Sequence, residues 1–209
     1  MEQRRAKDDE KMDEIYKALY VILYTWPHLY DNRAYRQQEG RIEMIKVAFM
    51  YDFDKTLSPK DMQEFGFLPS LGFDDPKKFW EEVSAFKDEN EMDGILAYMH
   101  MMIEKSEQAG KPVRREDLVA LGKGVELFPG VKDWFQRVNE EGRKLGLDVE
   151  HYIISSGLTE IIEGTEIADC FKKIYACRYY YDEQGVAKWP VLVVNYTTKT
   201  QYIFRINKQ

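Results

Sequence analysis

Two aspartates at the end of an apolar segment are the residues of this sequence best suited to chemistry. Asp52 and Asp54 follow the run Val47–Tyr51, and Thr56 comes two residues later. Five successive apolar or aromatic residues are typical of a strand buried on both faces, as in a parallel sheet. Ligands of open α/β sheets bind beyond the carboxyl ends of the strands, where this pattern places both carboxylates. The alternative is an ordinary turn after a strand.

A second polar segment also ends an apolar strand. The run 149–154 is predicted to be a strand, and Ser155, Ser156 and Gly157 follow it directly. About one hundred residues separate the two polar segments, and the sequence between them is mostly helical in pattern. The chain therefore offers two strand ends with polar side chains, joined by a helical insert.

These segments resemble signature motifs of one large family. Asp52-Phe53-Asp54-Lys55-Thr56 resembles the first motif of the haloacid dehalogenase (HAD) superfamily, most of whose members are magnesium-dependent phosphatases. The resemblance implies that Asp52 is a nucleophile that forms an aspartyl-phosphate. It implies that Asp54 protonates the leaving oxygen and later takes a proton from water. It also implies a Mg²⁺ ion held by the Asp52 side chain and the Asp54 backbone carbonyl, with Thr56 bracing the loop.

The second segment resembles the second motif of the same family. In that motif a Ser or Thr hydrogen-bonds the transferring phosphoryl group, and the family places a helical cap between the two motifs. The resemblance implies this role for Ser155, which follows the apolar run directly, with Ser156 as the second choice beside Gly157. Dehalogenases usually lack the second aspartate, so Asp54 favours hydrolysis of phosphate esters.

The family's third motif is a lysine that neutralises the nucleophile and the phosphoryl oxygens. Lys199 is the best candidate, because it follows a predicted return strand over 186–196 and precedes a short helical pattern. We expect Thr197 or Thr198 to cap that helix. Lys188 and Lys208 are weaker candidates.

The order of elements predicts the fold class. Strand, helix, strand, helix, strand is the pattern of a right-handed parallel α/β sheet. With the resemblance, we expect a Rossmann-like, HAD-like core with a helical cap insert. The expected division is 44–58 and 126–209 for the core, 59–125 for the cap, and 1–43 for an N-terminal helical extension and linker.

The resemblance stops before the family's fourth motif. That motif is a strand ending in a Gly-Asp-x-x-x-Asp-like pair that completes the magnesium shell, and no such strand follows Lys199 before Gln209. In the family this strand pairs with the first strand, so the first strand is expected to present an apolar edge. Three explanations stay open: a truncated enzyme, a non-catalytic relative, or another segment or chain on that edge. Truncation or a divergent short form is favoured, because three motifs are intact.

The composition narrows the class of protein. The 209 residues are 44% hydrophobic and 32% charged, as expected of a folded chain. A net charge of −7 argues against nucleic acid as the main partner. Cys170 and Cys177 form no CxxC pair, so we expect a reduced, cytoplasmic protein. The apolar run Ala18–Trp26 is too short to cross a bilayer, so no membrane is expected.

The expected function is Mg²⁺-dependent hydrolysis of a small phosphorylated metabolite through an aspartyl-phosphate. A cap over the site favours a small substrate, because a lid excludes large molecules and water. The rival hypothesis is an inactive or truncated HAD-fold protein that acts as an interaction module. Its homo-oligomer would assemble through a helix predicted within 12–30, where Leu19 and Ile22 share one apolar face.

Overall fold

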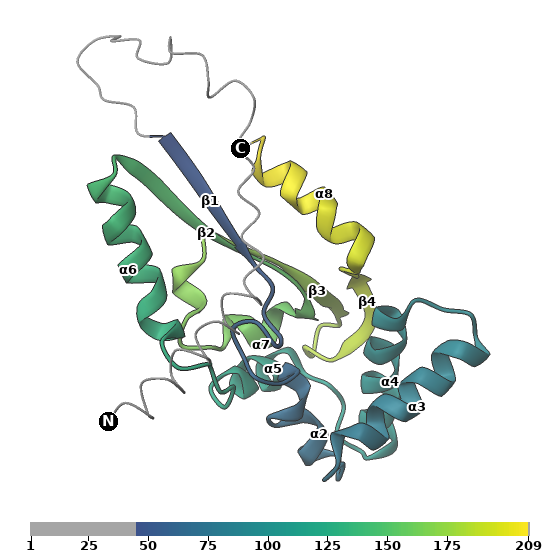
Figure 1. The fold of residues 1–209 in the computed structure, drawn as a ribbon. Helices are drawn as coiled ribbons and strands as arrows, with labels where there is room; N and C mark the ends of the chain where they lie inside the picture. Colours follow the sequence, from purple (N-terminus) through teal and green to yellow (C-terminus); the bar gives the residue numbers. More distant parts are fainter. Residues whose placement is uncertain (1–44, 209) are drawn as a thin grey trace, which may run out of the picture.

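A four-stranded sheet forms the centre of the computed structural model, which describes residues 45–208 (Figure 1). The strand order is β1-β2-β3-β4. The first three strands are parallel, and β4 is antiparallel to β3. The strands are β1 (Ile45–Tyr51), β2 (Leu147–Leu158), β3 (Lys173–Tyr181) and β4 (Ala187–Leu192). The predicted α/β class is confirmed, whereas the helix predicted within 12–30 lies outside the described residues.

The two strands that carry the predicted motifs lie side by side. β1 and β2 pair in register from Ile45 opposite Leu147 to Tyr51 opposite Ile153. The carboxyl ends of both strands therefore point the same way, toward the middle of the molecule (Figure 1). β2 continues to Leu158 instead of ending at Ile154 as predicted, because its ladder with β3 resumes at Leu158 after an irregular stretch.

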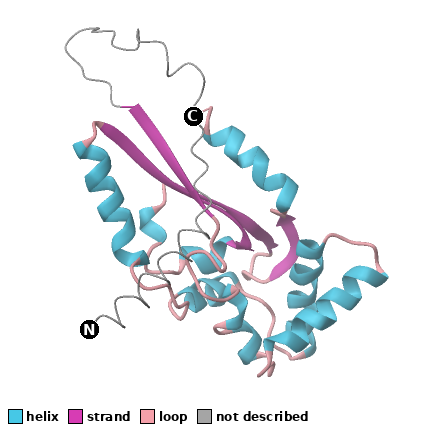
Figure 2. Cartoon of the chain, in the orientation of Figure 1, coloured by secondary structure: helices cyan, strands magenta, loops and turns pink. Residues whose placement is uncertain are grey.

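One helix covers each face of the sheet, and both contact β2 (Figure 2). α6 (Val131–Lys144) begins after Gly130, whose positive φ of 87° suits glycine at this turn. α8 (Tyr196–Ile206) lies on the opposite face, where the Tyr202 ring packs on Tyr175 at 4.7 Å between centroids. Phe135 of α6 is almost completely buried. The parallel strands thus run between two helical layers, which explains their continuous apolar sequences.

The segment between β1 and α6 is mostly helical, as predicted. α3 begins after Asp75, whose side chain accepts a hydrogen bond from the Lys77 amide, with Pro76 in the first turn. α3 and α4 pack on each other, and α4 also contacts β4. The division into a core and a cap stays a prediction. The helices are η2 (Met62–Glu64), α2 (Phe67–Ser70), α3 (Pro76–Glu89), α4 (Gly94–Gln108) and α5 (Arg115–Gly122).

Helix α5 packs on α7 (Thr159–Glu163), the helix that follows β2. Two glycines lie at this contact. A Cβ atom at Gly164 would lie 1.8 Å from the Val119 carbonyl oxygen, and one at Gly122 would lie 2.2 Å from the Ile161 carbonyl oxygen. The two segments approach so closely that neither position has room for a side chain.

Two predicted boundaries are wrong for local reasons. The pattern of residues 158–170 predicts one helix, but the structure breaks it into α7 and η3 (Ala168–Cys170), because the Thr165 hydroxyl group donates to the Ile162 carbonyl at the end of α7. The return strand predicted over 186–196 ends at Leu192, because Asn195 starts α8 with a capping box.

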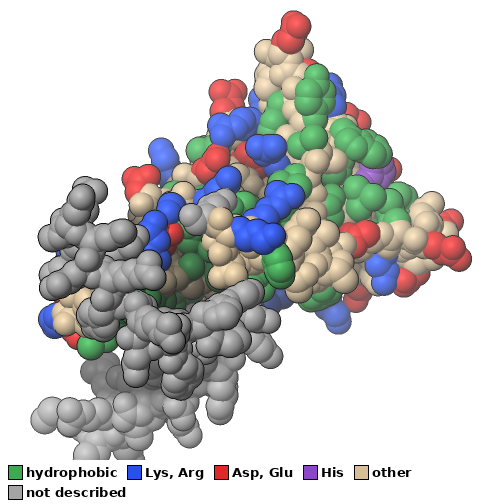
Figure 3. Space-filling view, turned by 90° about the horizontal axis from the view of Figure 1, so that it is seen from above, with side chains coloured by type: hydrophobic (Ala, Val, Ile, Leu, Met, Phe, Trp, Pro, Cys, Tyr) green, Lys and Arg blue, Asp and Glu red, His purple; other side chains and the backbone are tan. Residues whose placement is uncertain are grey.

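The surface of the described chain mixes both signs of charge. Figure 3 shows acidic and basic side chains interspersed over one face.

No strand within residues 45–208 pairs with the outer edge of β1, and Ile45 at its start is 52% exposed. Cys170 and Cys177 are both free. Among the described helices, none is both long enough and apolar enough to cross a membrane.

Candidate active site

The first and third predicted motifs meet in the structure. Asp52 directly follows β1, and Lys199 lies in the first turn of α8, 147 positions later. The Lys199 Nζ atom donates to Asp52 Oδ2 at 2.5 Å, and the Phe53 amide donates to Asp52 Oδ1 at 2.8 Å. The Asp52 side chain is still 42% exposed. It is therefore a fixed carboxylate that a ligand can reach.

Asp54 has a different environment. Its Oδ1 atom accepts a hydrogen bond from the Met62 amide at 2.9 Å. Burial raises the pKa of Asp54 to about 8, and the carboxylates of Asp61 and Asp52 add to the rise, while the Met62 amide opposes it. This carboxyl group can therefore carry a proton at neutral pH, as a general acid must.

The loop after the two aspartates is tightly closed. The amides of Thr56, Leu57 and Ser58 all donate to the Phe53 carbonyl oxygen, at 3.2, 2.8 and 3.2 Å. Lys55 adopts a positive φ of 58°, which is uncommon outside glycine and typical of functional loops. Thr56 thus supports the loop through its backbone, and its hydroxyl group forms no hydrogen bond within the described chain.

Lys55 and Asp61 form an ion pair beside Asp54. The Lys55 Nζ atom lies 2.7 Å from Asp61 Oδ2. Sequence reasoning missed Asp61, because it is one of many acidic residues in a helical region. Only the closed loop brings it close to Asp54.

The second predicted motif lies against the first. Ser155 is completely buried, and its Oγ atom accepts a hydrogen bond from the Gly157 amide at 3.0 Å. A Cβ atom at Gly157 would lie 2.9 Å from Asp54 Oδ2 and 2.1 Å from Met62 Cε. A side chain at this position would displace Met62 or Asp54, so glycine lets β2 approach Asp54 this closely. Within the described residues, neither Ser155 nor Ser156 forms a hydrogen bond to Asp52 or Lys199.

The oxygen atoms at this site are of the type that Mg²⁺ prefers. Asp52 offers carboxylate oxygens and Asp54 a backbone carbonyl oxygen, and Mg²⁺ commonly takes one or two carboxylates with waters and substrate phosphate oxygens. Within residues 45–208, no group of three or more His, Cys, Asp or Glu side chains is placed to hold a metal ion. The two aspartates therefore fit an ion that shares its coordination with a substrate.

The start of α8 differs in detail from the prediction. Asn195 is the N-cap residue: its Oδ1 atom accepts from the Thr198 amide at 3.0 Å, and the Thr198 hydroxyl group accepts from the Asn195 amide at 2.7 Å to complete a capping box. The Asn195 Nδ2 atom also donates to Asp93 Oδ2 at 2.9 Å, at the N-cap of α4. An Asn just before a helical pattern is a recognisable start signal, but its bond to Asp93 could not be read from the sequence.

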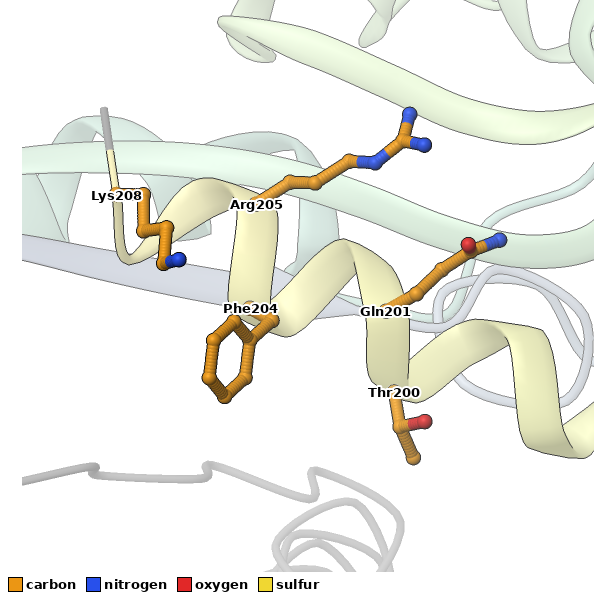
Figure 4. Close-up of a pocket in the computed structure, with 5 residues that line it drawn as sticks. All are labelled: Thr200, Gln201, Phe204, Arg205 and Lys208. Atoms are coloured by element: carbon orange, nitrogen blue, oxygen red, sulfur yellow. The ribbon is translucent and has the colours of Figure 1, made fainter.

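The two weaker lysine candidates lie elsewhere. Lys188 pairs with Asp182 at 3.2 Å beside the β3–β4 turn. Lys208 lies over the Phe204 ring, 5.1 Å from its centroid. Figure 4 shows Lys208 and Phe204 in a surface pocket, whose side chains come from α8 and the turn directly after it. Its residues are Thr200, Gln201, Phe204, Arg205 and Lys208. The pocket holds no carboxylate, so we place the site at Asp52.

Comparison with known proteins identifies the fold. No family model matches the sequence. An uncharacterized protein of Borreliella burgdorferi is 27% identical over 186 residues, which are 78% of this chain and 65% of that protein. A HAD family hydrolase of Salmonella enterica serovar Typhi superposes with a TM-score of 0.58 at 15% identity, over 79% of this chain and 52% of that one.

Two further structures have the same fold. A probable phosphoserine phosphatase of Vibrio cholerae superposes with a TM-score of 0.54 at 14% identity, over 78% of this chain and 46% of that one. A phospho-aspartyl intermediate analogue of phosphoserine phosphatase superposes with a TM-score of 0.51 at 14% identity, over 80% and 72%. The chain thus has a HAD-like fold. It spans less than two thirds of the length of the Borreliella burgdorferi protein and about half of the Salmonella enterica hydrolase.

Proposed function

We propose that this chain, whose fold is that of the HAD hydrolases, hydrolyses phosphate esters with Asp52 as the nucleophile. The observation that carries the proposal is the contact between the exposed Asp52 carboxylate and Lys199 at 2.5 Å. The ammonium group offsets the negative charge of the carboxylate and can bind the oxygens of an approaching phosphoryl group. Phosphoryl transfer depends chiefly on such positioning and charge stabilisation.

The proposed reaction has two steps. In the first, an Asp52 oxygen attacks phosphorus, the bond from phosphorus to the ester oxygen breaks, and Asp54 gives that oxygen its proton. In the second, water attacks phosphorus, Asp54 takes a proton from the water, and inorganic phosphate leaves Asp52. The pKa of about 8 suits Asp54 for both transfers near neutral pH. The likeness to a phospho-aspartyl analogue of phosphoserine phosphatase supports this route.

We further propose that Mg²⁺ assists and that the substrate is a small phosphorylated metabolite. The Asp52 side chain and the Asp54 backbone carbonyl would hold the ion, which would screen repulsion between Asp52 and an anionic substrate. The helical insert supports a small substrate, because α4 reaches the end of β2 beside the site: the Tyr98 hydroxyl group donates to the Ser156 carbonyl. A cytoplasmic location stays a prediction.

The test is hydrolysis of an aryl phosphate with and without Mg²⁺. We expect Mg²⁺-dependent release of the phenol that falls roughly a thousandfold or more in Asp52→Asn, because the nucleophile is lost. Asp148→Asn is the matched control, since Asp148 lies at the amino end of β2, away from the site. Circular dichroism should show both variants folded. Equal turnover by Asp52→Asn and the wild-type protein would refute the proposal.

A further inference from the structure

The strand beside the candidate site contains a bulge. Ile154 lies opposite Tyr175 and Leu158 lies opposite Cys177, so four steps along β2 match two steps along β3. Backbone groups inside such a bulge lose their partners in the ladder. Because buried backbone groups need hydrogen bonds, other groups must replace those partners. The bulge contains Ser155, Ser156 and Gly157.

Side chains from three other elements supply the missing bonds. The Met62 Sδ atom of η2 accepts from the Leu158 amide at 3.1 Å. The Ser156 carbonyl oxygen accepts from the Tyr98 hydroxyl group of α4 at 2.7 Å and from Cys177 Sγ of β3 at 3.3 Å. Within the bulge itself, Ser155 accepts from Gly157. The shape of this segment therefore depends on side chains as well as on the ladder.

Tyr98 is the stronger of the two donors to the Ser156 carbonyl. A thiol is a weak donor, whereas a phenol hydroxyl group at 2.7 Å is a good one. Tyr98 is 4% exposed, and burial raises the pKa of its phenol well above the usual value, so the phenol keeps its proton. Its ring meets Trp80 of α3 edge to face, with centroids 5.9 Å apart. Tyr98 is thus held firmly by both long helices of the insert.

We propose that Tyr98 is a positioning residue, which fixes the Ser155–Gly157 bulge of β2 from helix α4 and thereby sets the geometry of the site. The Ser156 peptide lies between the Ser155 hydroxyl group and Gly157, and Gly157 packs against Asp54. A shift of this peptide would move groups on both sides of it. The effect on catalysis rests on the proposed function; the effect on the bulge does not.

The chain offers a matched control. Tyr179 of β3 is 2% exposed, and its hydroxyl group donates to the Met99 carbonyl of α4 at 2.9 Å. This bond also joins α4 to the sheet through a buried tyrosine, but its acceptor lies in the helix and not in the bulge. Tyr98→Phe and Tyr179→Phe each remove one hydroxyl group and keep the ring. A purely structural role would give both variants similar effects.

The experiment measures amide hydrogen exchange by NMR and steady-state hydrolysis of an aryl phosphate. In Tyr98→Phe, the Gly157 and Leu158 amides should exchange faster than in the wild-type protein. In the same variant kcat should fall between about 10-fold and 100-fold while KM stays near its wild-type value, because small displacements at a reacting centre cost this much. Tyr179→Phe should show neither change.

Each other result decides a different claim. Equal exchange and equal kcat in the two variants would overturn the role of Tyr98. A wild-type protein without turnover would refute the proposed function alone. In that case amide exchange still decides: acceleration confined to Tyr98→Phe upholds the anchoring of the bulge, and its absence overturns it.

Discussion

At the scale of single residues, two aspartates only two positions apart occupy different environments. Asp52 is exposed and paired with Lys199, while Asp54 is desolvated and bonded to the Met62 amide, with its pKa raised to about 8. Different surroundings commonly give two carboxylates different roles in one site. The sequence predicted both residues, but not this contrast, because Met62 and Gly157 enter the site only through the tertiary fold.

His151 allows a prediction about pH. It is 3% exposed in β2, with Nδ1 2.9 Å from the Tyr51 hydroxyl group and Nε2 3.0 Å from Asn139 Oδ1. Burial lowers the pKa of His151 from 6.5 to about 4. Between these values the unfolded chain binds the proton and the folded chain does not. The free energy of unfolding should therefore fall as the pH falls from 6.5 toward 4, by at most about 1.4 kcal/mol per pH unit from this group.

The measurement is urea unfolding at several pH values for the wild-type protein and His151→Gln. The variant loses this one titration, so the difference between the two curves isolates it from the other acidic groups. Curves that stay parallel from pH 7 to pH 4.5 would show that His151 does not carry the effect.

At the scale of elements, predictions succeeded where the signal was local. The apolar run of β1 and the Asp75-Pro76 start of α3 are both local patterns, and the structure has a strand and a helix at these places. The end of β2 depends on another segment, because the ladder with β3 prolongs it, whereas the Asn195 cap that shortens β4 is a local signal that the prediction missed. The fold class was therefore predictable, whereas the end of β2 was not.

The contact between α5 and α7 gives a prediction about stability. Gly164→Ala would place a Cβ atom 1.8 Å from the Val119 carbonyl oxygen, a backbone atom that cannot rotate away. We expect a loss of about 1–3 kcal/mol in the free energy of unfolding, because the two helices must separate. Gly124→Ala is the control, since its nearest contact is an ordinary 3.5 Å to the Leu121 carbonyl oxygen. Thermal unfolding of both variants measures the difference, and equal midpoints would contradict the expectation.

At the scale of the whole molecule, the helical insert is joined to the sheet at several points. Tyr98 bonds to β2, Tyr179 bonds back to α4, and Asp93 meets Asn195. Asp93 caps α4 and Asn195 caps α8, the helix that carries Lys199. The helix that reaches the bulge and the helix that supplies the lysine therefore fix each other at their first turns. These links join residues up to 102 positions apart, so the sequence alone could not reveal them.

This link predicts unequal effects for two capping residues. Asp93→Ala removes the cap of α4 and the bond to Asn195, whereas Asp75→Ala removes only the cap of α3. Loss of a cap costs about 0.5–2 kcal/mol, so both variants should be less stable. Asp93→Ala should be the less stable of the two and should also have a lower kcat, because α8 carries Lys199. Denaturant unfolding and aryl phosphate hydrolysis test this. Equal kcat values for the two variants would show that the Asp93–Asn195 bond does not affect the site.

The parallel pairing of β1 with β2 also affects folding during synthesis of the chain. Ile45 pairs with Leu147, so about one hundred residues must be synthesised after β1 before its partner exists. At roughly 5–20 residues per second, the first strand waits on the order of 5–20 seconds, and Lys199 reaches Asp52 later still. During that time the apolar run of β1 is open to other nascent chains. Newly made protein should therefore depend on chaperones more than a helical bundle of equal length.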